Sequence, residues 1–142
     1  MPDENPIVAR TKHGELTLDQ IAELQPGLGT LMREVSDRYW IAWYAAQGGN
    51  WTLAAYQLRG VRKRLADGAL TRPQHKGMLA NYTAHVLEPL LQHCAARDFV
   101  AFDRTYRDGI QRANQMHIAT QHGEIVWKLP AIPPAHLELG DQ

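Results

Sequence analysis

The residue with the clearest capacity for chemistry is His117. It takes the fifth place in an apolar stripe with three- and four-residue spacing, so we expect it on the inward face of the last helix: Phe102, Tyr106, Ile110, Ala113, His117. Burying a polar group such as an imidazole without a hydrogen bond costs roughly 1–3 kcal/mol. His117 therefore needs a partner. A core tyrosine such as Tyr39 or Tyr82, a backbone carbonyl or a metal ion would each serve.

The five residues that end at His117 have the frame of the haem-attachment motif C-x-x-C-H, with Ala113 and Met116 in the two cysteine positions. The other histidines add no metal-binding pattern. His117 and His122 differ by five positions, which separates them by about 140° around a helix. With no H-x-x-x-H or E-x-x-H pair in the chain, we expect the remaining histidines on the surface.

Aromatic residues are dense between positions 39 and 56: Tyr39, Trp40, Trp43, Tyr44, Trp51 and Tyr56. Packing in a core explains such a set, and so does a flat apolar pocket for a planar ligand or an interface between two copies of the chain. Arg38 lies one turn before Ala42, beside the apolar stripe of the helix that begins at Leu28. There it would either hold a ligand carboxylate or extend its charged end into water.

The periodicity predicts an all-α protein, an antiparallel up-down-up-down four-helix bundle over residues 17–123. Residues 1–16 read as an irregular arm, and no pair of segments with alternating pattern predicts a hairpin. Thr17 has the form of a capping box with Gln20, and glycine and proline interrupt the chain at 26–29.

Four long helices follow: from Leu28 to Gln47, from the N-cap Asn50 to about 66, from 74 or 77 to 97, and from the N-cap Asp98 to the glycine cap Gly123. We expect Pro89 to kink the third. Residues 124–142 form an extended tail with three prolines, expected to pack back on the bundle.

Composition excludes several classes of function. Fifteen basic residues balance fifteen acidic ones, so neither nucleic acid nor an anionic membrane surface is an expected partner. The single cysteine, Cys94, excludes an internal disulfide, and its apolar position predicts a small buried hydrophobe. No signal sequence and no membrane-spanning apolar stretch is visible, so we expect a cytoplasmic protein.

Three short segments make the chain resemble small bacterial cytochrome c′-like four-helix-bundle proteins. They are the tryptophan-rich stretch Arg38-Tyr39-Trp40-Ile41-Ala42-Trp43 with the following Asn50-Trp51-Thr52-Leu53-Ala54-Ala55-Tyr56, the element Pro73-Gln74-His75-Lys76-Gly77, and the last helix with its C-x-x-C-H frame and His122-Gly123. The resemblance spans roughly residues 30–130. It implies a haem site on the last helix, with His117 as the axial ligand.

The two missing cysteines rule out a thioether link to haem. The resemblance then implies either haem held non-covalently through His117 or a cofactor that has been lost. Residues expected around such a ligand are Ala113, Met116, Arg38, Tyr39 and Trp43.

Three hypotheses of function follow. The chain is a ligand-binding bundle that takes a small planar or apolar molecule, with haem as the candidate cofactor. Alternatively it is a cofactor-free homodimer with a structural or interaction role. The third alternative is a small enzyme that uses His117 in acid–base chemistry.

Overall fold

The computed structural model describes residues 6–140, and most of them are helical. The elements, in chain order, are β1 (Ile7–Thr11), β2 (Gly14–Thr17), α1 (Leu18–Glu23), α2 (Leu28–Gln47), α3 (Trp51–Thr71), the 3₁₀ turn η1 (Pro73–His75), α4 (Lys76–Tyr82), the π-helical turn η2 (Thr83–Leu87), α5 (Glu88–Ala96) and α6 (Phe99–Ala119). The predicted helical class is therefore confirmed. None of the described helices has the length and apolarity that crossing a membrane requires.

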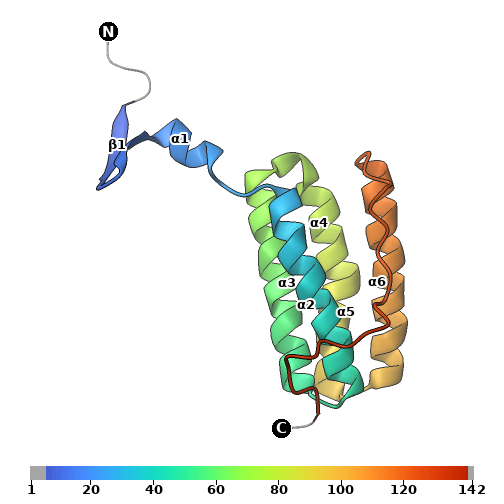
Figure 1. Cartoon of the computed structure of the whole chain (residues 1–142). Coiled ribbons are helices and arrows are strands. Elements are labelled where there is room, and N and C mark those ends of the chain that lie inside the picture. The colour runs from blue at the N-terminus through green and yellow to red at the C-terminus, as the bar shows by residue number, and fades with distance from the viewer. Residues whose placement is uncertain (1–5, 141–142) are drawn as a thin grey trace.

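Figure 1 shows α2, α3, the run α4–η2–α5 and α6 lying side by side, with neighbours in the chain running in opposite directions. Helix α3 packs against α2, α4 and α5, while α6 packs against α5 and α2. We call this part of the molecule, residues 28–119, the helical body. Its interior is apolar, and side chains such as Leu58, Val61, Val86, Leu90 and Phe102 are completely buried there.

The predicted helix starts are confirmed. Thr17 and Gln20 form the capping box of α1. The side chain of Asn50 accepts a hydrogen bond from the Leu53 amide, and that of Asp98 accepts one from Ala101. These bonds satisfy amide groups that the first helical turn leaves unpaired. Because each joins residues three positions apart, the helix starts could be predicted from the sequence.

The expected kink at Pro89 takes the form of the π-helical turn η2, directly before α5. Proline has no amide proton to donate to the carbonyl four residues back. In η2 the Glu88 amide instead donates to Thr83, five residues back. The π-helical turn accommodates Pro89 without breaking the helix, and α4, η2 and α5 continue in one direction in Figure 1.

Helix α6 ends earlier than predicted, and Gly123 is not its cap. The helix stops at Ala119, and Gln121 takes the left-handed conformation (φ 65°) usually left to glycine. The Gln121 amide donates to Ile118 and the His122 amide donates to His117, at 3.1 and 2.7 Å. This pair of bonds is a Schellman motif. It reverses the chain immediately after His117.

The prediction of an irregular arm without a hairpin is wrong for the described part of residues 1–16. β1 and β2 pair antiparallel around the turn at Lys12 and His13, with Gly14 at φ 147°. Both strands are short and largely exposed, so they lack the alternation that a half-buried strand shows. In Figure 1 this hairpin and α1 project away from the helical body.

The C-terminal tail after α6 descends beside that helix and then crosses the ends of α2 and α3 (Figure 1). Four side chains of the helical body and its connections hydrogen-bond tail backbone: Tyr44 to Pro130, Trp40 to Ile132, Asn50 to Glu138, and Asn114 to Trp127. Gly48 lets the tail approach, because a Cβ atom there would lie 2.1 Å from the Leu139 carbonyl oxygen.

Candidate functional site

A cavity of about 320 Å³ lies beside His117, at the end of the helical body where α2 begins and α6 stops. α2, α3, α4, α6 and the tail all contribute to it. The lining residues are Leu28, Gly29, Met32, Val35, Leu65, His75, Met78, Leu79, Tyr82, Ala113, Met116, His117, Thr120, His122, Ile125 and Trp127. A volume of this size matches the lower range of small-molecule sites in proteins.

The walls of the cavity are apolar with a few polar groups. None of the described residues that line it is a lysine, arginine, aspartate or glutamate. The hydroxyl of Tyr82 already donates to the Gly109 carbonyl, and that of Thr120 lies within reach of the Met116 carbonyl at 2.9 Å. An ionised group of an organic ligand buried here would lack a fixed counter-charge, so among organic ligands the cavity favours uncharged, apolar molecules.

His117 has one ring nitrogen engaged. Its Nδ1 lies 3.0 Å from the carbonyl oxygen of Ile125. A carbonyl oxygen only accepts, so this bond requires the proton on Nδ1, and in the neutral ring Nε2 then carries the free lone pair. The Trp127 indole packs edge-on against the imidazole, with ring centroids 6.0 Å apart.

This arrangement is compatible with both hypotheses for His117, a structural hydrogen bond to a carbonyl and a role as a metal ligand. The predicted backbone-carbonyl partner is present, and it belongs to the tail. A bond from one ring nitrogen to a carbonyl is also what orients histidines that bind a metal through the other nitrogen. The Schellman motif produces it, because the reversal at Gln121 returns Ile125 to the side of His117.

Of the other residues expected around a ligand, Ala113 and Met116 line the cavity, whereas Arg38, Tyr39 and Trp43 do not. Trp43 is buried, and its indole donates to Asp103 at 2.9 Å. Tyr39 is buried, and its hydroxyl donates to the Tyr106 carbonyl at 2.8 Å. Both are core residues that join α2 to α6.

Arg38 faces α3. Its Nη1 donates to Gln57 at 2.9 Å, and Nη2 lies 3.6 Å from a Glu34 carboxylate oxygen. The guanidinium also lies 5.7 Å from the centre of the Tyr56 ring, a distance at which cation and ring attract each other. Gly60 leaves room for it, since a Cβ there would lie 2.6 Å from Nη1. These contacts position Arg38 at the α2–α3 interface.

A cluster of buried tyrosines beside the cavity joins three helical segments. Tyr39 and Tyr106 stack with ring centroids 4.0 Å apart, and each hydroxyl donates to the other's backbone carbonyl. Tyr82 donates to Gly109 at 3.0 Å. Burial raises the pKa of all three phenols above their usual range, because the apolar interior disfavours the phenolate.

His75 and His122 also line the cavity. His122 is exposed at its edge, as expected of a surface histidine, whereas His75 is half-buried. Spacing along one helix could not place both at the cavity, because His75 precedes α4 and His122 follows α6. His85 and His93 lie elsewhere, next to Asn81 and Thr105. Within residues 6–140, no cluster of three or more histidine, cysteine, aspartate or glutamate side chains has an arrangement that could hold a metal ion.

The aromatic set of residues 39–56 is largely covered by the chain's own core and tail. Among the six, only Tyr56 is exposed, at 57%. Trp40 and Tyr44, the outermost of the α2 rings, hydrogen-bond the tail. Core packing therefore accounts for most of these rings without a second subunit.

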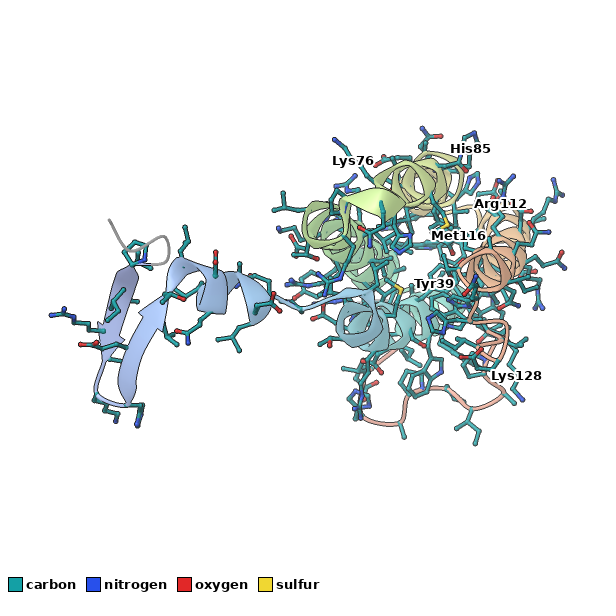
Figure 2. All side chains as sticks on the ribbon, turned by 90° about the horizontal axis from the view of Figure 1, so that it is seen from above. Tyr39, Lys76, His85, Arg112, Met116 and Lys128 are labelled. Atoms are coloured by element: carbon teal, nitrogen blue, oxygen red, sulfur yellow. The ribbon has the colours of Figure 1, made fainter. Side chains whose placement is uncertain are left out.

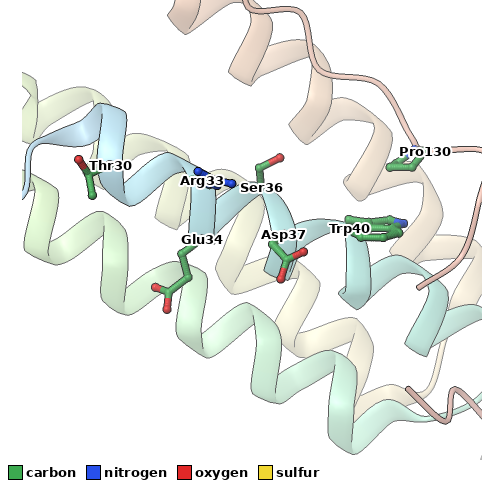
Figure 3. Close-up of a pocket in the computed structure, with 7 residues that line it drawn as sticks. All are labelled: Thr30, Arg33, Glu34, Ser36, Asp37, Trp40 and Pro130. Atoms are coloured by element: carbon green, nitrogen blue, oxygen red, sulfur yellow. The ribbon is translucent and has the colours of Figure 1, made fainter. Parts of the chain in front are cut away.

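A second hollow, of about 540 Å³, lies on the outer face of α2 (Figure 3). It is open, and five of its seven lining residues are polar or charged; the described part of the tail contributes Pro130 alone. Among its charged groups, Glu34 is paired with Arg64 at 2.6 Å. Among the described residues that line this hollow there is no histidine or cysteine and none of the residues predicted for the site.

Cys94 is buried, as predicted for a small hydrophobe. Burial raises the pKa of its thiol to about 11, because the charged thiolate is disfavoured in apolar surroundings. The thiol is therefore protonated at neutral pH, which argues against a role as nucleophile.

Comparisons with known proteins add no relative: no family model matches the chain, and neither the curated proteins nor the solved structures contain a match.

Proposed function

We propose that this chain is an antiparallel four-helix-bundle protein that binds a small apolar or planar ligand in the cavity beside His117. The observation that carries the proposal is the pairing of apolar, uncharged walls with one oriented imidazole whose Nε2 has no hydrogen-bond partner among residues 6–140. A largely apolar pocket with a few placed polar groups is the usual form of a small-molecule site.

Haem is the candidate ligand that the resemblance implies. Three members of the five-residue frame, Ala113, Met116 and His117, line the same cavity, so the frame faces the place where a ligand would lie. His117 would hold the iron through Nε2, and the apolar walls suit a macrocycle. When bound, haem supplies an iron centre whose redox potential and ligand affinity depend on the axial ligand and its hydrogen bonds.

The propionate groups of haem would find no lysine or arginine partner among the described residues that line the cavity. Arg38 is engaged at the α2–α3 interface, and the lining residues offer only imidazoles, His75 and His122, to the propionates. The propionates would therefore point out of the cavity into water. We expect weaker binding than in a site that provides a bidentate arginine.

Two titrations of the full chain test the proposal. Hemin should give a shifted, intensified Soret band, and His117→Ala should abolish it, while the control His85→Ala, an outward-facing residue in Figure 2, should not. A Soret band that survives His117→Ala, or a hemin spectrum unchanged by the wild-type protein, refutes haem as the ligand.

Nile red, an uncharged dye, tests the cavity without haem. Gly29 lines the cavity at the start of α2, and a Cβ there meets no atom within 4 Å, so Gly29→Phe should fill the space and reduce dye binding. Gly77→Phe is the matched control, because Gly77 occupies the same second position of α4, is equally open and lies outside the cavity. Equal dye binding by the two variants would overturn the proposal.

A further inference from the structure

Three methionine side chains line the cavity. Met32 comes from α2, Met78 from α4 and Met116 from α6, and they are all the methionines of the described residues. All three are half-buried. Figure 2, seen along the helical body, shows Met116 inside the group of helices, whereas Lys76, Arg112 and Lys128 point outward.

The donor set at the cavity is soft. It offers three thioethers and the Nε2 of His117, together with the imidazoles of His75 and His122, and no carboxylate stands among the described lining residues. Thioether and imidazole ligands suit Cu(I), whereas Mg²⁺, Ca²⁺ and Mn²⁺ require oxygen donors. A single positive charge is also the smallest that a neutral cavity would have to accommodate.

We propose that Met32, Met78, Met116 and the Nε2 atom of His117 form a Cu(I)-binding site. The proposal uses the cavity of the proposed function but does not require haem. It contains a single imidazole, so it is compatible with the lack of a histidine, cysteine or carboxylate metal cluster in residues 6–140. In the neutral ring, the bond from Nδ1 to the Ile125 carbonyl leaves the lone pair on Nε2 and fixes the orientation of the imidazole.

The test is an anaerobic competition for Cu(I) between the full chain and bathocuproine disulfonate. The wild type should take one Cu(I) per chain. The triple variant Met32→Leu, Met78→Leu, Met116→Leu should bind at least ~100-fold more weakly, because changes outside the ligand shell alone cost 10–100-fold in metal affinity. Equal affinity in wild type and triple variant overturns the proposal.

Leucine conserves the volume and apolarity of methionine, so the triple variant should still bind Nile red like the wild type. Loss of Cu(I) with retained dye supports the metal site. If the wild-type protein itself does not bind Nile red, that result counts against the cavity. X-ray absorption of the Cu(I)-loaded wild type is independent of any variant: sulfur scatterers are expected in the first shell, and a shell of nitrogen and oxygen alone overturns the proposal.

Discussion

Gly109 is the point at which one methyl group should disrupt the packing beside the cavity. A Cβ atom there would lie 2.4 Å from the Tyr39 hydroxyl, 2.6 Å from Val86 Cγ1 and 3.2 Å from the Tyr82 hydroxyl. Real Cβ contacts essentially never fall below 3.0 Å. In Gly109→Ala the Tyr39 hydroxyl must therefore withdraw by about 0.6 Å, the difference between 3.0 and 2.4 Å.

That movement has a calculable cost. Overpacking costs about 1–3 kcal/mol, and weakening the tyrosine hydrogen bonds to Tyr106 and Gly109 adds about 1 kcal/mol for each bond that breaks. Alanine gains about 1 kcal/mol over glycine inside a helix. If one of the two bonds breaks, its loss offsets the alanine gain, and the free energy of unfolding of Gly109→Ala should fall by about 1–3 kcal/mol.

Urea denaturation followed by tryptophan fluorescence measures this change. The midpoint should fall by about 1 M. Gly77→Ala is the control, because its Cβ would meet nothing within 4 Å, and it should leave stability equal or slightly higher. A Gly109→Ala protein as stable as Gly77→Ala would refute the assignment of tight packing between α6 and the tyrosines.

The remaining predictions concern the tail, the thiol and the phenols. Asn114→Ala removes two hydrogen bonds to Trp127, at 2.6 and 3.0 Å, so hydrogen exchange at the Trp127 amide should accelerate while exchange in the middle of α3 stays unchanged; unaltered exchange at Trp127 would count against the contact. Cys94, with its raised pKa, should react with Ellman's reagent at pH 8 only after unfolding in urea; rapid reaction of the folded chain would contradict its burial. Because burial raises the pKa of Tyr39 and Tyr82, the unfolded state loses phenolic protons first, so the contribution of these phenols to stability should be constant below pH ~10 and fall above it; Tyr82→Phe should make the fall of stability above pH ~10 less steep, and an identical slope would refute the assignment.

The sequence by itself determined the features that depend on neighbouring residues. Thr17, Asn50 and Asp98 were recognisable as helix starts because each side chain bonds an amide three positions along the chain. The helical periodicity likewise identified the inward positions of α6, and it placed Ala113 correctly among the buried residues.

Only the tertiary structure decided which of the predicted site residues meet. Arg38 lies beside the apolar face of α2, but its side chain packs over Gly60 and donates to Gln57 on α3, so it does not reach the cavity beside His117. His122 reaches the cavity through a turn whose left-handed residue is Gln121, not a glycine that the sequence would mark. The partner of His117 is the backbone carbonyl of Ile125. Because every residue has a backbone carbonyl, the sequence could not identify which one His117 would bond.

The contacts that distinguish this chain are therefore between segments far apart in sequence. Met32, Met78 and Met116 each look like ordinary core residues of separate helices, and nothing in their spacing relates them. Their gathering at one cavity depends on how α2, α4 and α6 pack. Local hydrogen bonds and periodicity determine helices, whereas the relative placement of helices, and with it the chemistry of the cavity, follows from side-chain packing such as that of Tyr39 against Gly109.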